Sequence, residues 1–224
     1  MLIWLLVACT NQTTESNSST VTETITQPVP AERPRVIILG DSLTAGLGIS
    51  AERSYPSLLQ NTFAQQGQPI EVINAGVSGD TTAGGLRRLD WLLKQNPDLV
   101  MVELGANDGM RGVSISNIES NISAIIERIQ EKQIDVILIG MQIPTNYGSE
   151  YTQQFKELYP MLAQKYQVEM VPFLLEGVAG DRTLNQADGI HPTAEGHVII
   201  ANTVLPFLQR WRASWTSADQ NTAL

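Results

Sequence analysis

Three residues of the sequence are of the types that perform nucleophilic catalysis. Ser42 lies in a Gly-Asp-Ser-Leu sequence, and Asp188 and His191 lie close together near the C-terminus. A serine hydroxyl is a weak nucleophile until a base accepts its proton, and that base is usually an imidazole oriented by a carboxylate. Since Asp188 precedes His191 by three residues, one tight turn can join them. We predict Ser42 as the nucleophile, His191 as the base and Asp188 as the orienting acid. The other histidine, His197, falls in a predicted helix, and we expect it to be a surface or packed residue.

Two further blocks contain donors that could stabilise a negatively charged intermediate. They are Asn-Ala-Gly-Val-Ser-Gly-Asp, which contains Gly76, and Gly-Ala-Asn-Asp-Gly, which contains Asn107. The tetrahedral intermediate of acyl transfer needs hydrogen-bond donors aimed at its oxyanion. The backbone N–H groups of Ser42 and Gly76 and the side-chain amide of Asn107 would supply three, and glycine allows the backbone to approach a substrate closely. Asp41 and Asp108 could be read as a carboxylate pair, but we assign them to loop hydrogen bonding and electrostatic support.

These blocks follow short apolar runs that alternate with helical patterns. Unbroken apolar runs are typical of strands buried on both faces of a parallel sheet. The predicted strands are 36–39, 71–74, 99–104, 136–139 and 168–171. The predicted helices are 55–66, 81–95, a helix opened by the capping box Ser116-x-x-Glu119, 150–166, and 193–211 with a bend or end near Pro206. Right-handed crossovers then give a three-layer α/β/α sandwich. Because ligands bind outside the carboxyl ends of such strands, the four blocks should meet there.

Taken in order, the four blocks resemble those of the GDSL, or SGNH, hydrolase family. The wider sequences Gly40-Asp-Ser-Leu-Thr-Ala-Gly-Leu-Gly48 and Gly105-Ala-Asn-Asp-Gly-Met-Arg-Gly112 resemble its bacterial thioesterase/protease/lysophospholipase and arylesterase branch. The resemblance covers about residues 35–210. It implies a flavodoxin-like, five-stranded parallel sheet of order 2-1-3-4-5, no metal or cofactor, and a Ser-Asp-His mechanism. It assigns the four signature positions to Ser42, Gly76, Asn107 and His191, and the acid to Asp188.

Composition limits the other function classes. The chain has 224 residues, of which 42% are hydrophobic, and a net charge of −9, which suits one domain and excludes a nucleic-acid partner bound through surface charge. Its single cysteine excludes an intramolecular disulfide and a cysteine-based metal site. We expect a monomer that uses neither a metal nor a cofactor.

The N-terminal sequence predicts export. Residues 1–8 are too short for a membrane span, which needs about 20 apolar residues, but they resemble the end of a signal peptide. Leu6-Val-Ala-Cys9 resembles a bacterial lipobox, although no Lys or Arg precedes it, so Cys9 is a candidate lipidation site and membrane attachment point. We expect a periplasmic or membrane-anchored lipoprotein of a bacterium. The predicted organisation is 1–9 signal-peptide remnant, 10–33 disordered polar tether, 34–212 hydrolase domain and 213–224 disordered tail.

Three functions are compatible with these residues. The first is hydrolysis of acyl esters through an acyl-enzyme on Ser42, and the resemblance suggests lysophospholipids, acyl thioesters and aryl esters as substrates. The second keeps the mechanism but removes O-acetyl groups from envelope polysaccharide or peptidoglycan. The third is a non-catalytic, flavodoxin-like binding module, which neither a Walker lysine nor a dinucleotide fingerprint supports.

Substrate choice depends on loops at the strand exits. Ile143, Pro144 and Tyr147, which follow the fourth predicted strand, could form a wall of an acyl pocket or could equally be ordinary loop packing. The segment 174–184 could form another wall.

Overall fold

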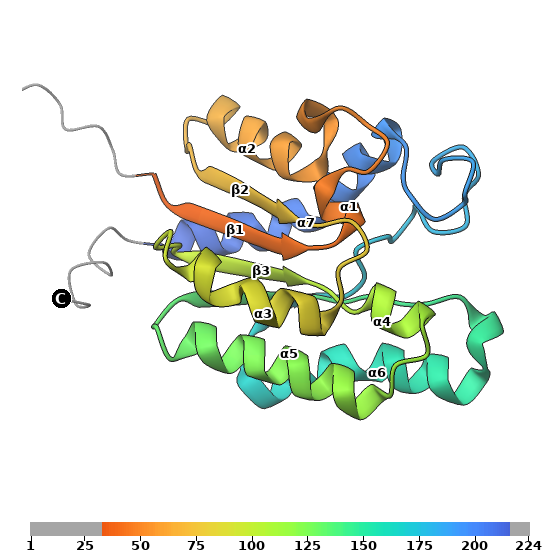
Figure 1. Ribbon diagram of the computed structural model, residues 1–224. Helices are drawn as coiled ribbons and strands as arrows, with labels where there is room; N and C mark the ends of the chain where they lie inside the picture. The colour runs from red at the N-terminus through yellow and green to blue at the C-terminus, as the bar shows by residue number, and fades with distance from the viewer. Residues whose placement is uncertain (1–32, 216–224) are drawn as a thin grey trace, which may run out of the picture. The chain divides into compact units, whose positions relative to one another are not determined.

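The fold is described here from a computed structural model, which describes residues 33–215. A five-stranded sheet has the order β2-β1-β3-β4-β5, and every pair of neighbouring strands is parallel (Figure 1). The strands are β1 (Arg35–Gly40), β2 (Glu71–Gly76), β3 (Leu99–Glu103), β4 (Asp135–Ile139) and β5 (Glu169–Val171). The predicted strand order is therefore confirmed.

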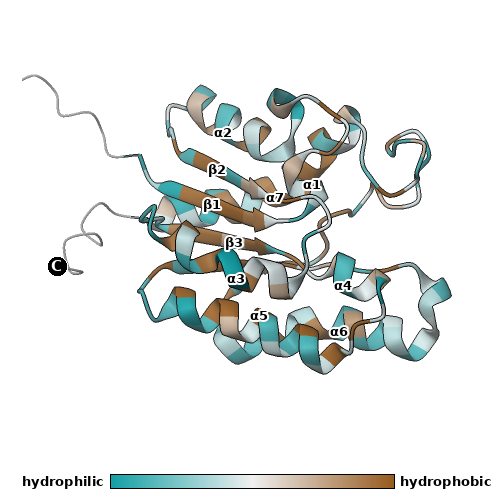
Figure 2. Ribbon diagram, in the orientation of Figure 1, coloured by the Kyte–Doolittle hydropathy of each residue, from teal (hydrophilic) through white to brown (hydrophobic). Residues whose placement is uncertain are grey.

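Helices cover both faces of this sheet. They are α1 (Ser42–Ala45), α2 (Tyr55–Gln65), α3 (Thr82–Leu93), α4 (Ala106–Met110), α5 (Ile115–Gln130), α6 (Ser149–Tyr166) and α7 (Ala194–Ser214), with short 3₁₀ turns η1 (Ala51–Arg53) and η2 (Thr145–Tyr147). Helices α2 and α7 pack together on one face, and α3, α5 and α6 pack side by side on the other (Figure 1). The strands are the most hydrophobic elements and lie between the two helical layers (Figure 2). This is the predicted three-layer α/β/α sandwich.

The strand register places the chemical blocks at one edge of the sheet. Gly40, the last residue of β1, is paired with Gly76 at the end of β2 and with Glu103 at the end of β3. The segments that follow these three residues therefore leave the sheet at the carboxyl ends of neighbouring strands. They are the segment with Ser42 after β1, the loop after β2, and the segment with Asn107 after β3.

One predicted helix start is wrong, and one of the two alternatives for the last helix is excluded. Helix α5 is capped by Ser114, whose hydroxyl accepts a hydrogen bond from the Asn117 N–H, and not by Ser116. The last helix, predicted over 193–211 with a bend or an end near Pro206, does not end there, because α7 continues through this residue to Ser214. A proline inside a helix costs one hydrogen bond. The buried apolar face of α7 continues beyond it through Leu208 and Trp211, and packing of that face holds the last two turns in place.

Helix α7 extends two positions past the predicted end of the domain at 212, because Ala213 and Ser214 belong to it. Cys9, the predicted tether up to residue 32, and the predicted tail from 216 lie outside the described residues. Within 33–215, none of the helices combines the length and the apolar character needed to cross a bilayer.

Candidate active site

Ser42, His191 and Asp188 form one continuous chain of hydrogen-bonding side chains. His191 Nε2 lies 2.9 Å from Ser42 Oγ, and His191 Nδ1 lies 2.6 Å from Asp188 Oδ2. A carboxylate can only accept, so Nδ1 carries the hydrogen and donates it to Asp188. Nε2 is then left as the acceptor for the serine hydroxyl. The structure therefore brings together the three residues predicted as a triad, in the order that proton transfer needs.

Asp188 is held by the turn that it begins. Its Oδ1 accepts hydrogen bonds from the backbone N–H groups of Ile190 and His191 at 2.9 and 3.0 Å. The His191 backbone N–H, the His191 side chain and the Ile190 N–H together hold the pKa of Asp188 well below its usual range, although the side chain is nearly half exposed. The carboxylate is thus ionised and points one oxygen at the imidazole.

Ser42 is the first residue of the four-residue helix α1. Asp41 caps this helix, because its Oδ1 accepts from the Leu43 N–H at 2.9 Å. The helix ends at Gly46, which has the left-handed conformation (φ 73°) that glycine adopts at low cost. This turn places the serine at the carboxyl end of β1, where it lines the cavity described below, and leaves its own N–H outside the helix's hydrogen-bond pattern.

The loop that holds His191 is tied to the loop after α1. Gln186 Nε2 donates to the carbonyls of Leu47 at 2.7 Å and Pro192 at 2.9 Å, and the Gln186 N–H donates to the His191 carbonyl at 2.7 Å. Gln186 therefore joins the segment carrying the base to the segment that follows the nucleophile. The sequence analysis did not identify this residue.

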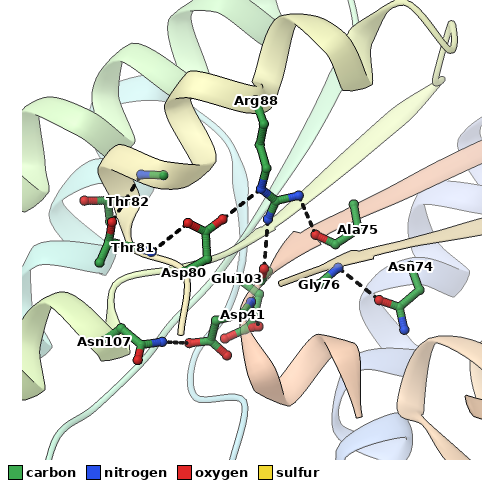
Figure 3. Close-up of polar contacts among 12 residues, drawn as sticks. Asp41, Asn74, Ala75, Gly76, Asp80, Thr81, Thr82, Arg88, Glu103 and Asn107 are labelled. Carbon is green, nitrogen blue, oxygen red and sulfur yellow. Dashed lines mark hydrogen bonds and ion pairs between the residues drawn. The ribbon is translucent and has the colours of Figure 1, made fainter. Parts of the chain in front are cut away.

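The prediction that the Gly76 N–H is an oxyanion donor is wrong. Its N–H already donates to Asn74 Oδ1 at 3.0 Å (Figure 3), and Gly76 does not line the cavity beside Ser42. A Cβ at this position would lie 2.2 Å from the Ala45 nitrogen. Glycine is needed at 76 because the end of β2 packs directly against α1.

Gly79, three residues later in the same block, occupies the position expected of Gly76. It lines the same cavity as Ser42 and Asn107. Its φ of 78° lies in the region that favours glycine, and within residues 33–215 its N–H donates to no acceptor. The signal in the sequence was the second glycine of the block, which directly precedes Asp80 and the helix cap at Thr81.

The cavity beside Ser42 and His191 has a volume of about 600 Å³. Its walls are mainly apolar and include Met141, Ile143, Pro144, Phe173 and Leu175, with Leu47 and Ile190 half exposed at its edge. Of the three residues predicted as a wall, Ile143 and Pro144 line it. Tyr147 does not line it; this residue lies in η2 and is 40% exposed to solvent. The second predicted wall, 174–184, contributes Leu175, Ala179 and Gly180.

Comparison with known proteins agrees with this geometry. Residues 38–199 match the GDSL-like Lipase/Acylhydrolase family. The chain is 44% identical to an arylesterase of Vibrio mimicus over 171 residues, which are 76% of this chain and 86% of that protein. It is 38% identical to thioesterase 1/protease 1/lysophospholipase L1 of Escherichia coli strain K12 over 175 residues, which are 78% and 83% of the two chains. The crystal structure of the psychrotrophic esterase EstA from Pseudoalteromonas sp., inhibited by monoethylphosphonate, matches with a TM-score of 0.76 and 33% identity, covering 79% of this chain and 97% of that one.

The chain belongs to the GDSL-like lipase/acylhydrolase family. It is a serine esterase, a carboxylic-ester hydrolase. Within residues 33–215 of this GDSL hydrolase, no cluster of three or more His, Cys, Asp or Glu side chains has the arrangement of a metal site.

A buried carboxyl group supports the nucleophile turn of this GDSL hydrolase. Glu103, at the end of β3, is fully buried, and its Oε2 accepts from the Asp41 N–H at 3.1 Å and from the Thr44 hydroxyl at 2.7 Å. The Tyr55 hydroxyl lies 2.7 Å from the Thr44 hydroxyl and extends this network to α2. Burial first, and then the nearby charge of Asp41, raise the pKa of Glu103 well above its usual value. The sequence analysis missed Glu103 because it lies within a strand.

Asp108 and His197, which the sequence also singles out, have structural partners in the GDSL hydrolase. Asp108 accepts from the N–H and the hydroxyl of Thr82 at 2.8 and 2.7 Å, in agreement with loop support. His197 is buried, so of the two predicted alternatives, a surface residue or a packed one, the second is confirmed. Its ring stacks on Tyr55 with a centroid separation of 6.1 Å, and its Nδ1 accepts from the Tyr55 N–H. Burial lowers the pKa of His197 to about 4, so it stays neutral near pH 7.

Proposed function

We propose that the protein hydrolyses acyl esters through a covalent acyl-enzyme on Ser42. His191 Nε2 takes the proton of the Ser42 hydroxyl as its oxygen attacks the acyl carbonyl, and the protonated imidazole then gives that proton to the departing alkoxide or thiolate. Water, deprotonated by the same imidazole, releases the acid. Asp188 keeps the imidazole oriented and stabilises its positive charge. The unbroken contact chain from Ser42 to Asp188 at the edge of an apolar cavity is the observation that carries this proposal.

We propose that the oxyanion is bound by the Ser42 N–H, the Gly79 N–H and the Asn107 side-chain amide. All three residues line the cavity. Asn107 Nδ2 uses one hydrogen on Asp41 at 2.9 Å, which leaves the second for substrate. Each such donor is typically worth about 10²–10³ in rate.

The cavity favours an acyl chain of several carbons as the group bound beside Ser42. An acetyl group would fill a small part of about 600 Å³, whereas the apolar walls suit a longer hydrocarbon chain. The relatives named arylesterase and thioesterase 1/protease 1/lysophospholipase L1 point to aryl esters, acyl thioesters and lysophospholipids. We therefore propose single-chain acyl esters as substrates, in preference to O-acetylated envelope polysaccharide or peptidoglycan.

The test is hydrolysis of p-nitrophenyl esters from acetyl to palmitoyl by the wild type and by Ser42→Ala. Activity that is lost in Ser42→Ala and rises with acyl length beyond acetyl is expected. A maximum of activity at the acetyl ester would instead favour the removal of O-acetyl groups as the function. A folded wild type that cleaves none of the esters would overturn the proposal.

We also propose that the protein is exported and attached to a bacterial membrane through a lipid on Cys9, and that it acts as a monomer. The lipobox-like sequence before Cys9 supports the first part. Labelling of the expressed protein with an alkyne analogue of palmitate should succeed for the wild type and fail for Cys9→Ser. Light scattering of the domain in solution measures its mass and so tests whether it is a monomer.

A further inference from the structure

The guanidinium group of Arg88, in α3, contacts three separate parts of the chain around the active site. Its Nε donates to Asp80 Oδ2 at 2.8 Å, its Nη1 to the Ala75 carbonyl at 2.7 Å, and its Nη2 to the Gly40 carbonyl at 2.9 Å. Figure 3 shows Arg88 reaching from its helix toward Asp80 and Ala75. The side chain is only 22% exposed, and that of Asp80 11%. The guanidinium is thus partly buried, and each of its three nitrogens donates a hydrogen bond.

The three acceptors enclose the two backbone donors of the proposed oxyanion site. Ala75 and Asp80 lie on either side of the loop that carries the Gly79 N–H. Gly40 precedes the turn that carries the Ser42 N–H, and its carbonyl also accepts from the Val77 N–H at 3.1 Å. Arg88 therefore joins the segment before the nucleophile to both ends of the Gly79 loop.

The surroundings of Asp80 fix its carboxylate for this contact. Its Oδ1 accepts from the Thr81 N–H at 3.0 Å, and a Cβ on Gly84 would lie 1.7 Å from that oxygen. Since Gly84 has no side chain, the carboxylate can lie against the first turn of α3. Asp80 is thereby held on one side by the helix and on the other by Arg88.

Arginine is the side chain suited to this position. Its planar fork presents donors in fixed directions, so one group can bind two carbonyls and a carboxylate at once. A lysine ammonium is a point charge that cannot reach all three with this geometry. Arg88 does not line the cavity, so it does not contact substrate.

We propose that Arg88 is a positioning residue that fixes the separation between the Ser42 and Gly79 N–H groups, so that both point at the same oxyanion. This inference rests on the proposed function of these two groups. Donors that are held in place in advance bind the transition state more strongly than the substrate. Loss of Arg88 should therefore lower kcat and leave KM nearly unchanged.

The experiment compares Arg88→Lys and Arg88→Ala with Arg87→Ala, a matched control on the same helix whose side chain is exposed. For both Arg88 variants, kcat on a p-nitrophenyl ester should fall by about 10- to 100-fold, less than the loss of a whole donor costs. Affinity for an alkyl trifluoromethyl ketone, whose serine adduct carries an oxyanion, should fall by the same factor. Millimolar guanidinium ion should restore part of the activity of Arg88→Ala. Arg87→Ala should match the wild type throughout.

A folded Arg88→Lys with kcat within twofold of the wild type would overturn the inference. So would a loss of kcat without a parallel loss of ketone affinity. If Arg88→Ala does not fold, Arg88→Lys and Asp80→Asn give the same comparison with milder changes. Ser42→Ala is measured in parallel: activity that survives in it defeats the proposed function itself, whereas activity that depends on Ser42 but not on Arg88 defeats only this inference.

Discussion

The carboxylate of Asp41 lies 2.9 Å from the side-chain amide nitrogen of Asn107. The other oxygen of the same carboxylate accepts from the Leu43 N–H at the start of α1. One buried side chain thus contacts both the turn that carries the nucleophile and, as Figure 3 shows, the amide of Asn107. The neighbour of the nucleophile in the Gly-Asp-Ser-Leu sequence is therefore part of the site's geometry.

Replacing Asp41 by Asn should lower kcat by about 10-fold with little change in KM. The amide has one accepting oxygen where the carboxylate has two, so it loses either the Leu43 cap or the Asn107 contact. Steady-state kinetics on a p-nitrophenyl ester measures the effect. Asn107→Ala should cost about 10²–10³ in kcat. The double variant should be no worse than Asn107→Ala alone, and strict additivity of the two losses would contradict coupling through this contact.

Asp41 should also make stability fall as pH rises. Burial, opposed in part by its hydrogen bonds, raises the pKa of Asp41 to about 6. Between about pH 4 and pH 6 the folded protein then holds a proton that the unfolded chain has released, so the free energy of unfolding decreases through this window. A rise of this size corresponds to on the order of 3 kcal/mol.

Urea unfolding of the wild type and Asp41→Asn between pH 4 and pH 7 checks this slope. The wild type should lose stability relative to the variant as pH rises. His197, with its lowered pKa, gives a slope of opposite sign in both proteins, so it cancels in the difference. Parallel curves for the two proteins would contradict the assignment.

The two glycines of the second block should respond differently to alanine. Gly76→Ala should destabilise the fold by about 2 kcal/mol or more, because its Cβ would meet the backbone of α1. Gly79→Ala has room for a Cβ, with Arg111 at 3.7 Å as its nearest neighbour, but its positive φ strains alanine by about 1 kcal/mol. Gly79→Ala should therefore fold, and its kcat should fall as the loop relaxes. Thermal unfolding and kcat measured on both variants separate these outcomes. A Gly79→Ala protein with unchanged kcat would argue against Gly79 as an oxyanion donor.

The cavity wall should control acyl-chain preference through Ile143. Ile143→Ala widens the cavity and should move the optimum of kcat/KM toward longer acyl chains, since each buried methylene is worth about 0.8 kcal/mol, or roughly a factor of 4. Tyr147→Ala should leave the profile unchanged, because Tyr147 does not line the cavity. The p-nitrophenyl ester series measures both. A shifted profile in Tyr147→Ala would mean that η2 reaches the substrate.

Sequence patterns predicted the sheet correctly, and the same physical reason explains why the proposed site residues lie together. Strands buried on both faces must be continuously apolar, and their carboxyl ends must share an edge, so Ser42, Asn107 and the loop after β2 had to converge. Asp188 and His191 could be paired because a three-residue turn sets their separation.

What the sequence could not provide was geometry that depends on exact chain direction. Gly76 ends the strand whereas Gly79 lies in the loop after it, and this shift of three residues decides which glycine lines the cavity. Glu103 and Arg88 act from within a strand and a helix, where their polarity alone carries no sign of a partner. Pro206 suggested a helix end, but the packing of α7 outweighs the one hydrogen bond that proline removes.

Ser42 and His191 are separated by 149 positions in the chain, with the nucleophile just after the first strand and the base just before the last helix. During synthesis, Ser42 leaves the ribosome long before the imidazole that activates it. An unfinished or truncated chain that lacks the segment from 188 onward therefore carries an inert serine. Hydrolytic competence arises only when both ends of the domain have come together, so the cell is spared ester cleavage by incomplete copies, and the return of activity during refolding reports the closure of the domain.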